Sequence, residues 1–157
     1  MITSLWMKPG DDLKAALDIR AQVFQQELGF SQAEDQDALD AYSYHLVLLY
    51  NDVPVAAGRI SYDGIGTARL SRICVLPKFR HQGIGDGLVK VLDYKASQLG
   101  MKKSRVETIP ELEPFYMRIG YLRDGQTRQF AGMELISMEK ETNDGTRENC
   151  AHQCTCS

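Results

Sequence analysis

A glycine-rich loop joins an apolar strand-like run to an amphipathic helix, and this order restricts the fold more than any other part of the sequence. The run Arg72–Leu76 precedes the loop, and apolar residues then recur at helical spacing from about Gly85 to Leu99. A second strand-like run, Ser104–Ile109, follows the helix. Two strands that are joined by a helical crossover lie parallel in one sheet. The unit therefore predicts a mixed α/β fold.

Apolar periodicity and turn-forming residues predict the remaining elements. Helices are expected over residues 11–28 and 111–119, and an acidic loop is expected over 30–42. Strands are expected over 44–50, 55–62, 68–76 and 133–139. The first three of these strands have short connections, so they form an antiparallel meander. The predicted fold class is α/β (α+β), with a mixed central sheet and helices on both faces.

The length and charge of the chain limit its organisation and its partners. A chain of 157 residues with 43% hydrophobic residues can bury a core of its own, so a single domain is expected over 1–140, with a polar tail over 141–157. The net charge of −3 gives no general attraction to nucleic acid or to anionic lipid. The longest apolar run, Leu46–Tyr50, is far too short to span a membrane. The first residues lack a secretory signal pattern, so a cytoplasmic location is expected.

The four cysteines do not suggest a disulfide framework. Cys74 lies in an apolar run, where a small buried packing role is expected, and the other three lie in the last eight residues. The pattern Cys150-x-His152-x-Cys154-x-Cys156 matches no common spacing of zinc ligands. No metal site is expected.

The glycine loop is expected to bind an anion. A helix that begins after Gly83 presents unpaired N–H groups and the positive end of its dipole, and Lys78, Arg80 and His81 add donors suited to a diphosphate. A dinucleotide-binding fingerprint would require a glycine where Leu88 stands. A Walker loop would require Gly-Lys-Ser or Gly-Lys-Thr, which does not follow Gly83.

The remaining pattern, Arg80-x-x-Gly83-x-Gly85, resembles the acetyl-CoA motif of the GNAT superfamily of N-acetyltransferases. The resemblance covers residues 11 to about 140 and includes Phe115-Tyr116-x-x-x-Gly120-Tyr121. In detail, the chain is similar to the small bacterial ElaA-like branch. One departure is Glu134-Leu135, which stands where relatives in that branch tend to carry Pro-His.

The resemblance implies a GNAT-like domain in which two parallel strands splay apart and hold acetyl-CoA, the cosubstrate, between them. The strand before the glycine loop would pair with the pantetheine arm, and the loop would hold the diphosphate. The implied cofactor-binding residues are Ile73, Cys74, Val75, Arg80, His81, Gln82, Gly83, Ile84, Gly85 and Asp86. The implied reaction is direct attack of a primary amine, on a small molecule or peptide, on the thioester. The superfamily also includes many homodimers.

The resemblance further implies catalytic roles. Tyr116 is expected to protonate the leaving thiolate, and a backbone N–H near Cys74 or Val75 is expected to stabilise the oxyanion. Three candidates for the base stay open, each acting directly or through water: Glu27, Glu107 and His45.

Other interpretations of these residues remain alongside the enzymatic one. The chain could bind acyl-CoA as a sensor without turnover, or the glycine loop could be only a tight turn. Arg72 is expected either to form an ion pair, with Glu107 as the suggested partner, or to contact the substrate, and the ion pair is favoured. The acidic residues Asp35, Asp37 and Asp40 would form a solvated rim, which would favour a cationic amine as acceptor.

Overall fold

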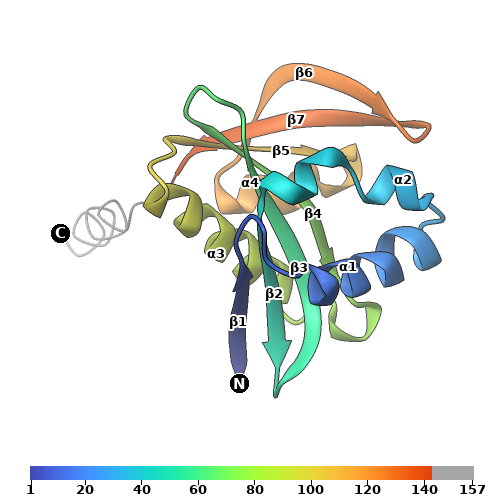
Figure 1. Cartoon of the computed structure of the whole chain (residues 1–157). Helices are drawn as coiled ribbons and strands as arrows, with labels where there is room; N and C mark the ends of the chain where they lie inside the picture. The colour runs from blue at the N-terminus through green and yellow to red at the C-terminus, as the bar shows by residue number, and fades with distance from the viewer. Residues whose placement is uncertain (143–157) are drawn as a thin grey trace.

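Seven strands form one twisted sheet, which a computed structural model describes over residues 1–142 (Figure 1). The strand order across the sheet is β1-β2-β3-β4-β5-β7-β6. The strands are β1 (Ile2–Met7), β2 (Tyr44–Tyr50), β3 (Val53–Tyr62), β4 (Thr67–Val75), β5 (Lys103–Thr108), β6 (Leu122–Phe130) and β7 (Met133–Glu141). All neighbouring pairs are antiparallel except β4 and β5, which are parallel, as the helical crossover between them predicts.

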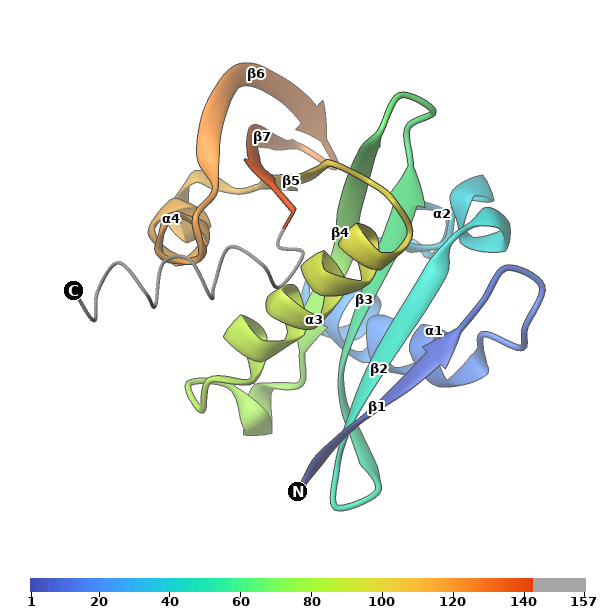
Figure 2. The same ribbon diagram turned by 90° about the vertical axis from the view of Figure 1, so that its left-hand side faces the viewer.

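Helices cover both faces of the sheet, as predicted. One face carries α1 (Lys14–Arg20) with its π-helical continuation η1 (Ala21–Glu27), and the other carries α3 (Ile84–Gln98), as Figure 2 shows. The shorter helices are α2 (Gln32–Asp35), η2 (Ala38–Tyr42), η3 (Pro77–Phe79), η4 (Pro110–Leu112) and α4 (Glu113–Ile119). The described part of the chain contains no helix that is long and apolar enough to cross a membrane.

Two apolar clusters, one on each face of the sheet, form the core. The larger cluster includes Leu88, Val89 and Leu92 of α3, which are fully buried where this helix packs on β3 and β4. A Cβ atom at Gly58 would lie 2.5 Å from Leu92 Cδ1, so this glycine lets α3 pack directly on β3. The smaller cluster joins α1 to the opposite face and includes the buried Cys74.

The predicted helices and strands are present with shifts of a few residues, but two strands were not predicted. Both β1 and β6 are edge strands, and most of their side chains are exposed. An edge strand that is solvated on both faces has no apolar alternation, which explains why the sequence pattern missed them. The last strand continues through Glu141, one residue beyond the predicted domain. Residues 143–157 of the predicted tail, with Cys150, Cys154 and Cys156, lie outside the described residues.

Candidate functional site

The parallel strands β4 and β5 separate about halfway along β4, as predicted for a splayed pair of strands. Their paired residues run from Thr67 and Lys103 to Leu70 and Val106. Beyond this point β4 continues to Val75, paired only with β3. Within residues 1–142, β4 has only β3 and β5 as neighbours, so its edge is open along the last part of the strand. Exposed backbone groups on such an edge can pair with an extended ligand.

A bulge shapes β4 where it leaves β5. The register with β3 shifts between Ala57 and Arg59, and Arg72 adopts a φ of 53°, an uncommon conformation for a residue other than glycine. The Arg72 side chain donates from Nε to the Asp35 carbonyl (2.8 Å) and from Nη2 to Asp37 (3.2 Å). These contacts with the α2 segment and the residues after it hold the strained Arg72 in place.

The glycine loop leaves the start of α3 without a cap. The N-cap residue Gly83 has a φ of 80°, and no side chain within residues 1–142 accepts a hydrogen bond from the first turn. Helical bonding begins with Gly87, whose N–H donates to the Gly83 carbonyl (3.2 Å). The unpaired N–H groups and the helix dipole together favour an anion at this position. The geometry therefore fits the diphosphate that the sequence predicted here.

Arg80 lies beside this loop and connects it to the end of β4. Its Nε donates to the Val75 carbonyl (2.9 Å), and its two terminal nitrogens form a bidentate ion pair with Glu27 (2.7 and 2.6 Å). The hydrogen bond from Arg80 outweighs the effect of burial and holds the pKa of Glu27 below its usual value. A carboxylate with a lowered pKa and both oxygens engaged is a poor proton acceptor. The structure thus places Glu27 with Arg80 and gives it no free oxygen.

Helix α4, which carries Tyr116, packs beside the glycine loop through Phe115. A Cβ atom at Gly85 would lie 3.5 Å from the ring of Phe115, the neighbour of Tyr116, and 4.0 Å from a methyl group of Val75. The Tyr116 ring is buried and makes edge-to-face contacts with Phe115 and Tyr121. Burial raises the pKa of the Tyr116 phenol, so it stays protonated at neutral pH. Within residues 1–142 its hydroxyl makes no hydrogen bond.

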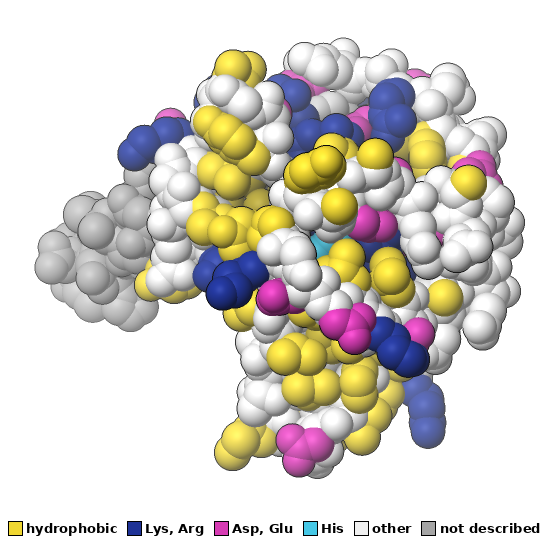
Figure 3. Space-filling model, viewed as in Figure 1, with side chains coloured by type: hydrophobic (Ala, Val, Ile, Leu, Met, Phe, Trp, Pro, Cys, Tyr) yellow, Lys and Arg dark blue, Asp and Glu magenta, His cyan; other side chains and the backbone are white. Residues whose placement is uncertain are grey.

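A polar cavity of about 350 Å³ lies where β4 and β5 separate, on the face of the sheet opposite to α3. Arg69 on β4 and Arg105 on β5 are paired in register, and Glu107 follows on the same face of β5. Glu107 accepts from Arg69 (2.8 Å) and from Arg128 on β6 (2.6 Å). Figure 3 shows Lys and Arg side chains, with Asp and Glu beside them, near the top of the molecule, where β6 and β7 lie.

A family model described as an acetyltransferase (GNAT) domain matches residues 13–142. The chain belongs to the GNAT acetyltransferase family. A relative within it is YjcF of Bacillus subtilis, named an uncharacterized N-acetyltransferase. It is 34% identical over 137 residues, which cover 85% of this chain and 96% of YjcF. Members of this family are acyl-CoA-dependent enzymes, so the predicted family and enzyme class are confirmed.

Solved structures share this GNAT fold over nearly the whole described chain. Escherichia coli ElaA has a TM-score of 0.79 at 23% identity and covers 90% of this chain and 100% of its own. An acyl-CoA N-acyltransferase from Pseudomonas aeruginosa has a TM-score of 0.78 at 19% identity, covering 89% and 99% of the two chains. A GNAT acetyltransferase from Elizabethkingia anophelis, solved with acetyl-CoA bound, has a TM-score of 0.68 at 19% identity, covering 89% and 97%. Assignment to the ElaA-like branch stays a prediction.

The expectation of an acidic rim is wrong for this GNAT domain. Asp35 and Asp40 are buried, and both carboxylates bind the fully buried Arg20 (3.1 and 2.8 Å). Asp40 and Asp37 also bind Arg59 (2.8 and 2.7 Å). These aspartates neutralise arginines inside the fold, because an unpaired charge in such a buried place would be costly. Carboxylates that are already paired with arginines do not favour a cationic acceptor.

The suggested pairing of Arg72 with Glu107 is also wrong. Arg72 is held by Asp37 and by two backbone carbonyls, those of Glu34 and Asp35. The positive φ at the bulge turns the Arg72 side chain toward the α2 segment. Glu107 instead binds the two arginines of the cavity.

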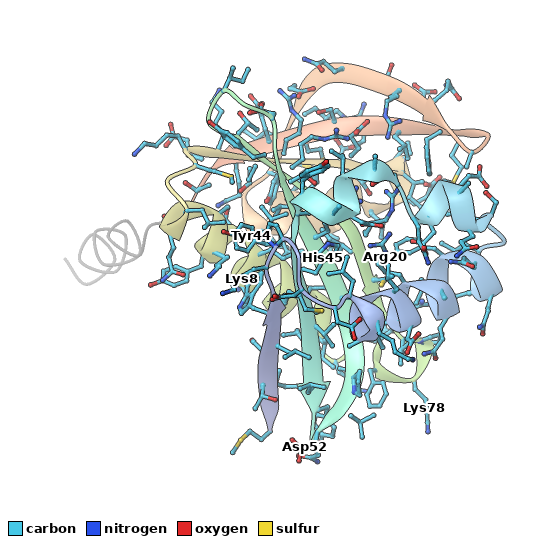
Figure 4. The ribbon with its side chains drawn as sticks, viewed as in Figure 1. Lys8, Arg20, Tyr44, His45, Asp52 and Lys78 are labelled. Carbon is cyan, nitrogen blue, oxygen red and sulfur yellow. The ribbon has the colours of Figure 1, made fainter. Side chains whose placement is uncertain are left out.

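The side chains of two further candidate residues, His45 and Cys74, are buried in the core. His45 is fully buried, its Nε2 lies 3.0 Å from the Asp40 carbonyl, and burial lowers its pKa (Figure 4). It is therefore enclosed in the core and unable to contact an acceptor. Burial raises the pKa of the Cys74 thiol to about 12, so this residue contributes packing and its backbone to the site, not a nucleophile.

Sequence reasoning missed the arginines of the cavity. Arg69, Arg105 and Glu107 are the polar residues that alternate with buried Leu70 and Val106 along two strands. This alternation was available in the sequence and marks a polar sheet face. Arg128 carried no such signal, since it lies on the unpredicted strand β6.

Proposed function

We propose that this protein transfers the acetyl group of acetyl-CoA to a primary amine of a small molecule or peptide by direct attack on the thioester. Membership of the GNAT family supports acetyl transfer from an acyl-CoA. The amine acceptor and the residue roles are the parts that we add. The single observation that carries them is the open edge of β4 that ends beside an uncapped helix N-terminus.

The cosubstrate fits this arrangement along its whole length. Backbone groups of residues Ile73–Val75 would pair with the pantetheine arm, and the N–H groups of residues 82–86 would bind the diphosphate. Arg80 would contribute a guanidinium, and His81, with its φ of 63°, turns the chain into the loop. Glu27 orients Arg80 through the bidentate pair, so we assign it a positioning role.

The chemistry requires three tasks besides alignment of the reactants. A backbone N–H of Cys74 or Val75 would stabilise the oxyanion formed when the neutral amine attacks the thioester carbonyl. Tyr116 would donate its proton to the departing thiolate of CoA. Of the candidate bases, Glu107 is the one that lies where β4 and β5 part. Both of its oxygens accept from arginines, as those of Glu27 do, so we propose that it orients a water molecule that carries the amine proton to solvent.

Titration calorimetry with acetyl-CoA and mass spectrometry of acetylated amines test the proposal together. Tyr116→Phe removes only the hydroxyl, so it should leave the Kd for acetyl-CoA unchanged and lower kcat by about 100-fold or more. Tyr94→Phe is the matched control, because Tyr94 is exposed on α3. Binding without acetylation of any amine would instead indicate a sensor of acyl-CoA. Failure to bind acetyl-CoA would rule out both roles.

A further inference from the structure

The cavity where β4 and β5 part has the size and position of an acceptor site. Its volume of about 350 Å³ is at the lower end of the range for small-molecule sites, which suits a compact metabolite. Four strands line it: β4, β5, β6 and β7. Because Arg69 and Glu107 lie at the point where the two parallel strands separate, the cavity is next to the gap proposed for the thioester.

Two arginines of the cavity share one carboxylate, so positive charge exceeds negative charge in this group. Arg69 and Arg128 share the single carboxylate of Glu107, so this group of three carries one excess positive charge. Arg105, also in the wall, pairs with Glu139 (3.2 Å) and with Asp124 (3.4 Å). The two carboxylates around Arg105 more than balance its charge, so the positive excess is confined to the part of the cavity that Arg69 and Arg128 line.

The guanidinium groups also keep many donors free. Each guanidinium has five N–H donors in a planar fork. Within residues 1–142, Arg69 and Arg128 each use one donor in a hydrogen bond, in both cases to Glu107. Their side chains are 40% and 49% exposed, so the remaining donors face water. Such forks bind carboxylates and phosphates in a bidentate manner.

We infer that this cavity takes the acceptor and that the acceptor carries an oxyanion, a carboxylate or a phosphate, on the same scaffold as its amine. The inference rests on the proposed function and names its substrate class. The oxyanion would bind the free donors of Arg69 and Arg128, and the amine would lie toward the gap between β4 and β5. An acceptor bearing only positive charge would be repelled by the same lining.

Matched pairs of amines test the charge preference. L-methionine and L-methioninamide differ in the carboxylate, and O-phosphoethanolamine and ethanolamine differ in the phosphate. We expect the anionic member of at least one pair to have a kcat/KM at least about tenfold higher, since hydrogen bonds to charged groups are worth that much or more. The pair that shows the preference identifies the anion. The amide has the less basic amine, so intrinsic reactivity works against this result.

Arg128→Gln should abolish the preference, because it removes one fork from the cavity. Arg123→Gln is the matched control: Arg123 lies on the same strand but pairs with Glu113 outside the cavity, so the preference should remain. Calorimetric titration of the four probes into the CoA-loaded protein gives a second measurement that needs no turnover. Equal binding and equal kcat/KM within both pairs would overturn the inference, as would a preference that survives Arg128→Gln.

Failure of the proposed function has a different signature. In that case no probe of either class gains an acetyl group, whereas failure of the inference leaves neutral amines acetylated as well as anionic ones. If nothing is acetylated, the titration still decides the charge preference of the cavity.

Discussion

Two groups of arginines and carboxylates lie near the same part of the sheet, but their surroundings differ. In the first, Arg20, Arg59 and Arg72 face Asp35, Asp37 and Asp40. The charges are equal in number, and Arg20 is only 1% exposed. In the second, two cavity arginines, Arg69 and Arg128, share one carboxylate, and all three side chains contact solvent. The same residue types therefore build an internal brace in one place and an open binding surface in the other.

The difference shows that balance and burial, not residue type, decide what a charged cluster does. A buried pair contributes little net stability as a pair, but the loss of one partner leaves an unpaired charge in the core. A solvated arginine loses little by the loss of its partner and gains by binding a ligand. The buried network also fixes the β4 bulge through Arg72, so it supports the site without contacting a substrate.

The largest expected loss of stability comes from replacing an arginine of the buried network with glutamine. Arg20→Gln leaves the buried carboxylates of Asp35 and Asp40 without their main partner, so we expect the free energy of unfolding to fall by about 3 kcal/mol or more. Urea denaturation followed by circular dichroism measures it. Lys14→Gln, at an exposed pair with Asp18, should leave it nearly unchanged. A small loss for Arg20→Gln would mean that water reaches the network.

Acid should weaken the buried network next. Burial alone would raise the pKa values of Asp37 and Asp40, but the hydrogen bonds and charge of their arginine partners outweigh it and hold both pKa values below the usual range. A carboxyl with a lowered folded-state pKa contributes stability above its unfolded pKa, and this stability is lost as pH falls below about 4. Unfolding of the wild type at a series of pH values should therefore show a decline in that window.

The variant Asp37→Asn isolates part of this decline. Asp37 is the more accessible of the two carboxyls, and its replacement removes one titrating group that binds Arg59. The variant should be less stable than the wild type at neutral pH, and its stability should fall less steeply in acid. An unchanged slope would mean that other carboxyls cause the acid sensitivity.

The ion pair of Glu27 and Arg80 lies between the two extremes, being balanced but about one-third exposed. Glu27→Gln should therefore cost less than about 1 kcal/mol of unfolding free energy. Arg80 would lose its orienting partner, so we expect the Kd for acetyl-CoA to rise a few-fold, with kcat at saturating cosubstrate nearly unchanged. Calorimetry and steady-state rates separate the two quantities. A large fall in kcat with an unchanged Kd would restore Glu27 as a candidate base.

The part of the site proposed for acetyl-CoA lies within one short segment of the sequence, so it could be predicted. The part proposed for the acceptor depends on how distant strands pair, which the sequence pattern does not show. Gly83 and the apolar spacing of α3 lie within one short segment, so the sequence predicted the strand, loop and helix there. The partner of Arg72 was mispredicted because the bulge redirects its side chain, and a positive φ at an arginine has no sequence signature. Arg69 and Arg128 meet only because β5 and β7 set the distance between β4 and the polar edge strand β6.

Arg69→Gln, in the cavity, is expected to have the smallest effect on stability and gives the clearest comparison with the buried network. Arg69→Gln removes the same charge as Arg20→Gln, but Glu107 keeps Arg128 as its partner and the site is open to water. We expect the free energy of unfolding to change by less than about 0.5 kcal/mol, while kcat/KM for the preferred acceptor falls by about tenfold or more. A destabilisation close to that of Arg20→Gln, with activity lost only in proportion to unfolding, would make the cavity a second brace. A stable variant with impaired acceptor use would instead show that the surplus charge at this position serves binding.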